Sequence, residues 1–220
     1  CTDYCLDEVA DSTAAHILNA ARRISVSRDR LMDGNFEMNG LRPMLRLENS
    51  TICFVGFGNI ARNLYRKMRA FFGHVVAVDP YITDRSMYPD VEFLELHEAL
   101  SRADVVTMHL QLTPATRGII GEQEFQSMKP GVIFVNTARG GLVDEAALMR
   151  ALDSGRISYC ALDVLGTENF SGSPLLHREN VILTPHISWC SEAALAELQK
   201  KTAQNVVETF LHGEPIYRAV

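Results

Sequence analysis

Hydrophobic residues gather in six short runs along the chain, separated by stretches of mixed polarity. The runs occupy residues 51–55, 74–78, 104–108, 132–135, 157–162 and 181–184. Most of them are continuous rather than alternating, which is typical of strands that are buried on both faces of a parallel sheet. The pattern therefore predicts a parallel sheet that lies between layers of helices.

Helical periodicity fills several of the intervals between these runs. Apolar residues recur at helical spacing in two of the connections, at Ile60, Leu64, Met68 and Phe71 and at Ala146, Leu148, Ala151 and Leu152. Strands that alternate with helices form βαβ units, so we expect an α/β fold with a doubly wound parallel sheet. Right-handed crossovers in such a sheet place the ligand at the carboxyl ends of the strands.

Two longer helical patterns flank the region of the predicted sheet. The first has one apolar face over about 20 residues, formed by Ala10, Thr13, Ala14, Ile17, Leu18, Ala21 and Ile24. Residues 27–50 read as an irregular arm with short helical pieces. A closing helix over 191–211, with Leu195, Leu198, Thr202, Val206 and Phe210 on one stripe, ends before Gly213 and Pro215. We expect a cofactor domain over 1–188 and a remnant of a second domain over 189–220.

Composition and charge narrow the classes of function. The 220 residues are 47% hydrophobic and 22% charged, with a net charge of −6, which suits a folded domain with a sizeable core. No basic patch favours nucleic acid as a partner, and no apolar run reaches the ~18 residues of a membrane span. The five cysteines form no C-x-x-C pair, and no signal-peptide pattern is present, so we expect reduced thiols in the cytoplasm.

A glycine motif follows the first apolar run. Gly56 ends that run, Gly58 comes two residues later and Ala61 lies inside the helical pattern that follows. This is the G-x-G-x-x-G/A fingerprint between a strand and a helix. The first glycine permits a tight turn, the second lets the backbone approach a pyrophosphate, and the helix start offers free N–H groups to the phosphates.

An acidic residue after the second run indicates which nucleotide binds. Asp79 follows the run 74–78 and lies 21 residues after Gly58, close to the ~20 residues expected for the acid that binds the adenosine ribose. A carboxylate there disfavours the 2′-phosphate of NADP, so NAD is the predicted cofactor. A plain structural glycine turn, or a Rossmann domain for another nucleotide such as S-adenosylmethionine, are the alternatives.

Three polar residues follow the last three runs. Arg139 comes after 132–135, Glu168 after 157–162 and His186 after 181–184, so a parallel sheet brings them to the edge that holds the glycine motif. An arginine can bind a substrate carboxylate through two hydrogen bonds. A histidine can exchange a proton with a carbonyl oxygen, and a carboxylate on its far nitrogen fixes the tautomer and stabilises the imidazolium.

Each of these residues also has an ordinary structural interpretation. Arg139 could form a salt bridge in a turn, Glu168 could be a solvated surface charge and His186 could be a structural histidine. The other six histidines lack metal-ligand spacing with a cysteine or a carboxylate, so no metal site is expected. The trio is nevertheless what hydride transfer to a 2-oxo acid requires.

Several motifs together resemble the D-isomer-specific 2-hydroxyacid dehydrogenase family over nearly the whole chain. They are Val-Gly-Phe-Gly-Asn-Ile-Ala, Val-Asp-Pro-Tyr, Thr-Ala-Arg-Gly-Gly-Leu-Val-Asp-Glu, Ala-Leu-Asp-Val and Leu-Thr-Pro-His-Ile-Ser-Trp. The resemblance implies that Arg139, Glu168 and His186 are the catalytic residues, although Asn169 stands where the family often has proline. It implies cofactor contacts at Gly56, Gly58, Asn59, Ile60, Asp79, Leu110, Thr137, Ala138, Arg139, Asp163 and His186, with Thr13 as a further candidate.

Within the family, the opening helix and His186-Ile-Ser-Trp-Cys-Ser191 look like the C-terminal-binding-protein corepressor branch and bacterial enzymes near it. Trp189 would then lie beside the substrate, or else pack in an ordinary interface. The resemblance also implies a homodimer, and it implies that the N-terminal part of the substrate domain is absent. Two functions stay open: an NAD(H)-dependent oxidoreductase acting on a small 2-hydroxy or 2-oxo acid, and an NAD-gated corepressor-like interaction protein.

Overall fold

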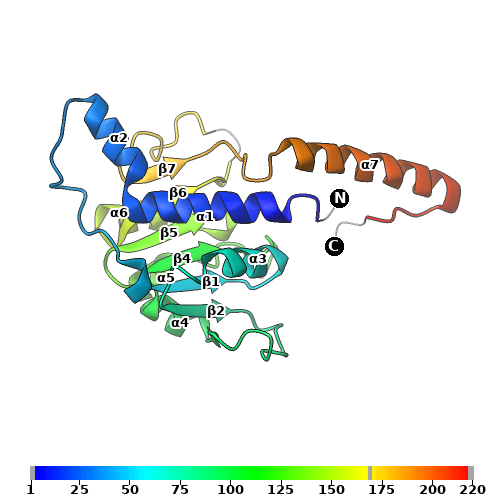
Figure 1. Cartoon of the computed structure of the whole chain (residues 1–220), viewed down its shortest axis with the longest axis horizontal. Coiled ribbons are helices and arrows are strands. Elements are labelled where there is room, and N and C mark those ends of the chain that lie inside the picture. The colour runs from blue at the N-terminus through cyan, green and yellow to red at the C-terminus, as the bar shows by residue number, and fades with distance from the viewer. Residues whose placement is uncertain (1–2, 168–169, 218–220) are drawn as a thin grey trace.

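The chain folds around one parallel sheet of seven strands (Figure 1). The computed structural model describes residues 3–167 and 170–217. The strands are β1 (Thr51–Val55), β2 (His74–Val78), β3 (Val91–Phe93), β4 (Val105–Met108), β5 (Val132–Asn136), β6 (Ile157–Leu162) and β7 (Val181–Leu183). Their order is β3-β2-β1-β4-β5-β6-β7, and every neighbouring pair is parallel. The predicted doubly wound α/β fold is confirmed.

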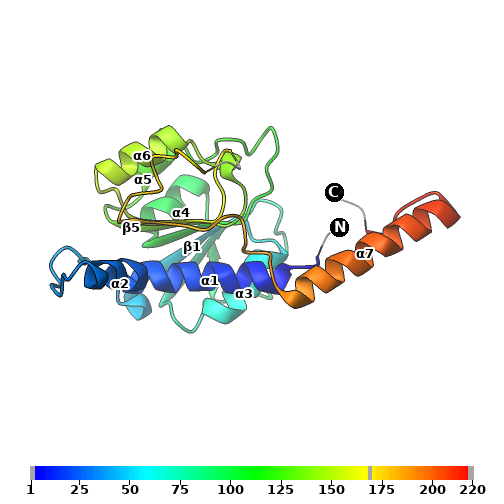
Figure 2. The same ribbon diagram turned by 90° about the horizontal axis from the view of Figure 1, so that it is seen from above.

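Helices cover both faces of this sheet (Figure 2). One face packs against α1 (Leu6–Arg22) and α3 (Asn59–Met68), and the other against α4 (Leu96–Arg102), α5 (Glu122–Ser127) and α6 (Glu145–Asp153). Successive residues of β1 enter opposite cores, because Cys53 lies in one cluster and Phe54 in the other. Burial on both faces explains why the strand runs are continuously apolar.

The strand β3 was not predicted. Its three residues, Val91 to Phe93, include the charged Glu92, and they pair with β2 at the edge of the sheet. A segment this short and this polar carries no hydrophobic period of its own. Phe71 was also assigned wrongly, because α3 ends at Met68 and the Phe71 side chain is 45% exposed.

The opening helix and the arm differ in detail from the prediction. The first helix ends at Arg22, Arg23 adopts a left-handed conformation with φ of 57°, and α2 (Ile24–Met32) follows at once. Ile24 is 58% exposed and is not part of the buried face. The arm beyond α2 is irregular apart from a short 3-10 turn, Leu47–Asn49. The opening helix therefore ends two residues before the predicted face does, and α2 is a helical piece of the kind expected in the arm.

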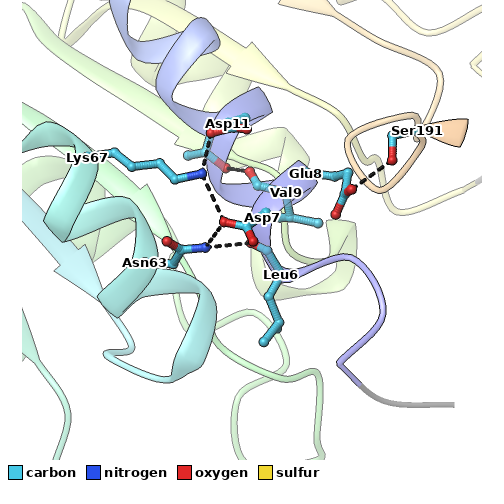
Figure 3. Close-up of polar contacts among 9 residues, drawn as sticks. Leu6, Asp7, Glu8, Val9, Asp11, Asn63, Lys67 and Ser191 are labelled. Carbon is cyan, nitrogen blue, oxygen red and sulfur yellow. Dashed lines mark hydrogen bonds and ion pairs between the residues drawn. The ribbon is translucent and has the colours of Figure 1, made fainter. Parts of the chain in front are cut away.

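Helix α1 is fastened to α3 at its amino-terminal end (Figure 3). The Lys67 ammonium lies 3.1 Å from a carboxylate oxygen of Asp7 and 2.5 Å from one of Asp11. The Asn63 amide also donates to Asp7 at 2.7 Å. Since α3 follows the glycine motif, these contacts fix α1 relative to the predicted phosphate site.

The closing helix α7 (Glu192–His212) projects away from the sheet (Figure 1). Ala194 is its buried residue, and the apolar stripe is open to solvent, with Val206 66% and Phe210 88% exposed. The helix itself was predicted correctly, and its assignment to a second domain remains a prediction. Among the residues that the structure describes, no helix is long and apolar enough to cross a membrane.

Candidate active site

The glycine motif has the geometry that a phosphate site needs. Gly56 has φ of +91°, and a Cβ there would lie 2.9 Å from the carbonyl carbon and oxygen of His109. Gly58 caps α3, and a Cβ on it would meet no atom within 4 Å. The first glycine is therefore required by the fold itself. The second leaves open space in front of the first N–H groups of a helix, where an anion is stabilised.

The Asp79 carboxylate holds the loop of the glycine motif through hydrogen bonds. Its Oδ2 accepts a hydrogen bond of 2.8 Å from the Phe57 backbone N–H, and its Oδ1 accepts one of 3.0 Å from Tyr81. The carboxylate at the end of β2 thus lies against the glycine motif, as the ribose-binding role predicts.

His109, which follows β4, supports the loop from the other side. Its ring stacks on Phe54 with centroids 5.8 Å apart and lies 3.0 Å from the Thr107 hydroxyl. Burial of the ring lowers the pKa of His109 to about 3, so the imidazole is neutral at physiological pH. This residue shapes the site through packing and carries no charge into it.

A cavity of about 710 Å³ opens at the carboxyl edge of the sheet. It is lined by eight of the predicted site residues, Ile60, Leu110, Thr137, Ala138, Arg139, Asp163, His186 and Trp189. They come from α3 and from the loops after β4, β5, β6 and β7. Residues far apart in sequence thus meet where parallel-strand topology places a ligand.

Arg139 reaches the cavity from the loop after β5. The Asn136 side chain holds that loop, because it donates to the Arg139 carbonyl at 2.9 Å and accepts from Ala138 N–H at 3.0 Å. A Cβ on Gly140 would collide with the Leu165 carbonyl, so only glycine permits this approach. The Arg139 guanidinium is exposed and donates to the Ala138 carbonyl. Within the described residues it forms no ion pair, which leaves its charge free for an anion.

His186 lies in a turn after β7 and has a left-handed backbone with φ of 54°. Asp163 holds the turn: its backbone carbonyl accepts from His186 N–H at 3.0 Å, and its carboxylate accepts from Ile187 at 3.0 Å and Ser188 at 2.8 Å. The His186 ring is exposed and lines the cavity. The Trp189 indole N–H donates to the His186 carbonyl at 2.8 Å. The backbone that carries both side chains is thus held by one buried carboxylate.

Thr13 reaches the site as well, whereas Glu168 is not placed. The Thr13 and Thr137 hydroxyls lie 2.7 Å apart and are buried, so Thr13 reaches the site through Thr137. Glu168 lies outside the described residues. A second cavity of about 680 Å³ is lined by Arg139 and His186 together with Gly166 and Phe170.

Sequence reasoning missed several residues that line the 710 Å³ cavity, among them Tyr4, Cys5 and Ser188. Burial raises the pKa of the Tyr4 hydroxyl and of the Cys5 thiol, and the nearby positive charge of Arg139 opposes both shifts. No periodic pattern marks residues that precede a helix, so only the fold shows that they reach the site. The adjacency of Ser188 to the predicted Trp189 was the one available signal.

The residues present fit a polar ligand. Ser188 is 3% exposed, and its hydroxyl has no hydrogen-bond partner within the described part of the chain. A buried hydroxyl without a partner is rare in proteins and is normally satisfied by a ligand or by water. Because Ser188 lines the 710 Å³ cavity, this hydroxyl is available to a polar ligand there. Among the described residues, no group of three His, Cys, Asp or Glu side chains could hold a metal ion.

Comparison with known proteins identifies the family. The family model described as "D-isomer specific 2-hydroxyacid dehydrogenase, NAD binding domain" matches residues 14–188. The chain belongs to this family. The matched region contains the glycine motif, Asp79, Arg139 and His186. NAD is therefore confirmed as the cofactor, in place of the alternative nucleotides that the glycine motif left open.

Relatives with known activities cover most of this chain. It is 36% identical to D-3-phosphoglycerate dehydrogenase of Mycobacterium tuberculosis over 219 residues, which are 98% of this chain and 40% of that protein. It is also 36% identical to hydroxypyruvate reductase of Blautia hydrogenotrophica over 175 residues, 79% of this chain and 54% of that protein. The chain thus spans between two-fifths and about half of the length of these relatives.

Solved structures of dehydrogenases have the same fold as this chain. D-lactate dehydrogenase of Aquifex aeolicus, complexed with NAD and lactic acid, superimposes with a TM-score of 0.87 at 28% identity, over 100% of this chain and 73% of that chain. D-lactate dehydrogenase of Lactobacillus jensenii with NAD+ gives 0.88 at 25% identity, over 100% and 70%. The matches do not single out the corepressor branch, and they give no support to the non-enzymatic alternative.

Proposed function

We propose that this chain is the cofactor-binding and proton-transferring part of an NAD(H)-dependent dehydrogenase that interconverts a small 2-oxo acid and the 2-hydroxy acid. One observation carries the proposal. Arg139 and His186 come from loops after different strands. They line one cavity together with Ile60 of α3, the helix that follows the glycine motif. A cation for the substrate carboxylate and a proton donor for its carbonyl oxygen thus face the same space.

Each residue has a role that follows from its chemistry. The Arg139 guanidinium, which is free of ion pairs among the described residues, binds the substrate carboxylate through two parallel hydrogen bonds. His186 donates a proton to the carbonyl oxygen in reduction and takes it back in oxidation. Glu168, which follows β6 in sequence, is the proposed partner of the His186 ring.

The reaction balances with the known cofactor. When bound, NADH would supply the hydride to the substrate carbonyl carbon. His186 would give the proton to the carbonyl oxygen, so that a 2-hydroxy acid forms and the imidazole is left neutral. The fixed main chain around His186 and Arg139 keeps both groups oriented before substrate arrives.

The aromatic side chains beside the site support a small substrate. Trp189 and Tyr4 pack edge to face with ring centroids 6.3 Å apart, and both line the cavity that Arg139 enters. We propose that Trp189 lies against the non-reacting part of the substrate, where a rigid indole excludes water and limits size.

We also propose that the protein is a cytoplasmic homodimer. Large apolar side chains are exposed on α2 and on the arm after it, with Met32 73% and Phe36 81% exposed. Exposed apolar residues in one region are typical of a protein interface. Light scattering of the full-length protein should give twice the monomer mass, and a monomer at micromolar concentration would exclude the dimer.

Turnover by the full-length protein that contains this chain tests the proposed function. NADH oxidation is measured with a panel of 2-oxo acids, for the wild type and for Arg139→Gln and His186→Asn. Loss of Arg139 should mainly raise KM for the acid. Loss of His186 should lower kcat about 100-fold or more, with NADH binding retained in both. Full activity of both variants would refute the assignment.

A further inference from the structure

The turn that carries His186 depends on a single buried carboxylate. Asp163 is fully buried, and its two carboxylate oxygens accept hydrogen bonds from the N–H groups of Ile187 and Ser188. A third donor is the Thr184 hydroxyl, which lies 2.5 Å from Asp163 Oδ1. A buried carboxylate needs donors of this kind to remain charged. The orientation of His186 therefore depends on what satisfies Asp163.

The Thr184 hydroxyl has one hydrogen and two neighbours. It lies 2.5 Å from the charged Asp163 and 3.2 Å from Nε2 of His16. The short contact to a carboxylate is the stronger hydrogen bond, so the hydroxyl hydrogen goes to Asp163. Thr184 must then accept from His16, which requires His16 to carry its hydrogen on Nε2.

His16 is well placed to act on this turn from a distant part of the chain. It lies on α1, is 8% exposed, and is 168 positions away from Thr184 in sequence. Burial lowers the pKa of His16, while the charge of Asp163 raises it. The ring is therefore a neutral imidazole at physiological pH, with one donor nitrogen.

The same helix holds two neighbouring parts of the site. The Thr13 hydroxyl forms a hydrogen bond of 2.7 Å with the hydroxyl of Thr137, in the loop after β5. The Ser12 hydroxyl donates to the Ser188 carbonyl at 3.3 Å. Thr13 and His16 are the polar residues of the otherwise apolar buried face of α1, and the half-buried Ser12 lies beside them. All three hydrogen-bond to loops at the carboxyl edge of the sheet.

We propose that His16 is a positioning residue for His186: its Nε2–H group donates to Thr184, which directs the Thr184 hydroxyl onto Asp163 and so fixes the turn that presents the His186 ring. The inference rests on the proposed function, because it assigns a purpose to the orientation of His186. His16 itself touches no substrate, and it acts through Thr184 and Asp163.

Matched variants of the full-length protein separate this role from packing. Glutamine can place an N–H group where His16 has Nε2, whereas asparagine places one where the ring has Nδ1. We expect His16→Gln to keep kcat within about twofold and His16→Asn and His16→Leu to lower kcat about tenfold. KM for NADH should stay nearly constant in all three. His177→Gln, at an exposed histidine, is the control.

A spectroscopic measurement tests the hydrogen-bond direction without reference to activity. Long-range proton–nitrogen NMR of the ¹⁵N-histidine-labelled protein should show His16 as the neutral Nε2–H tautomer. A hydrogen on Nδ1, or equal kcat values for the Gln, Asn and Leu variants, would overturn the proposal.

Different results would refute the proposed function and the positioning role of His16. An active His186→Asn protein would refute the proposed function, whatever the His16 variants do. An inactive His186→Asn protein together with a fully active His16→Leu protein would retain the proposed function and refute the role of His16.

Discussion

At the scale of single residues, the two glycines of the cofactor loop have different reasons to be glycine. Gly56 combines a positive φ with a close approach to the His109 backbone, whereas Gly58 borders open space. The sequence motif identifies both positions but cannot separate their roles. The difference depends on what lies next to each residue, and His109 is 53 positions away from Gly56 in sequence.

The first prediction follows from this difference. Gly56→Ala should lower the free energy of unfolding by about 1–3 kcal/mol, because it adds backbone strain and a clash. Gly58→Ala should leave stability within about 0.5 kcal/mol of the wild type yet weaken NADH binding, because only the ligand uses the space at Gly58. Chemical denaturation and NADH fluorescence titration measure the two effects. Equal losses of stability in both variants would contradict this account.

A second prediction concerns His109, whose pKa burial lowers to about 3. The unfolded chain binds a proton near pH 6.5 and the folded chain does not, so stability falls as pH drops from about 6.5 toward 3. Between about pH 7.5 and 5 this one residue should cost about 2 kcal/mol of unfolding free energy. His109→Asn should flatten the pH profile by that amount in urea denaturation. An unchanged slope would show that His109 is not buried as a neutral ring.

At the scale of elements, the sequence was enough to predict the strands and the crossover helices, but not the break between α1 and α2. Continuous apolar runs gave six strands nearly to the residue, because burial on both faces leaves a strong signal. The break between α1 and α2 at Arg23 left no signal in the sequence, because it is caused by tertiary contacts. The buried Arg23 guanidinium bonds the carbonyls of Ala20 and Pro43, each at 3.0 Å, and the Ser158 hydroxyl at 3.2 Å.

This joint gives a third prediction. Arg23→Lys should lower the free energy of unfolding by about 2 kcal/mol or more, because one ammonium cannot reach the groups that a planar guanidinium joins. NADH affinity should not change, since the Arg23 contacts lie away from the cavity at the carboxyl edge. Arg28→Lys, at an exposed position with a surface ion pair, is the control. A stability loss below about 0.5 kcal/mol would contradict the bridging role.

At the scale of the whole molecule, the sheet explains why the candidate site could be predicted before its geometry was known. Arg139 follows β5 and His186 follows β7, the two neighbours of β6, and parallel pairing carries both to the edge that holds Gly58. The family resemblance had already made Thr13 of α1 a candidate. The contact between His16 and Thr184 could be recognised only from three-dimensional packing, because the two residues are 168 positions apart in sequence. The apolar stripe of α7, by contrast, lies exposed.

The central claim is that this edge of the sheet supports hydride transfer to a 2-oxo acid. The most direct measurement uses the full-length protein with NADH that carries deuterium in place of its transferable hydrogen, and a panel of small 2-oxo acids. We predict deuterium at C2 of a 2-hydroxy acid of a single configuration, detected by mass spectrometry, and its loss in His186→Asn. Binding of NADH without deuterium transfer to any acid of the panel would contradict the account.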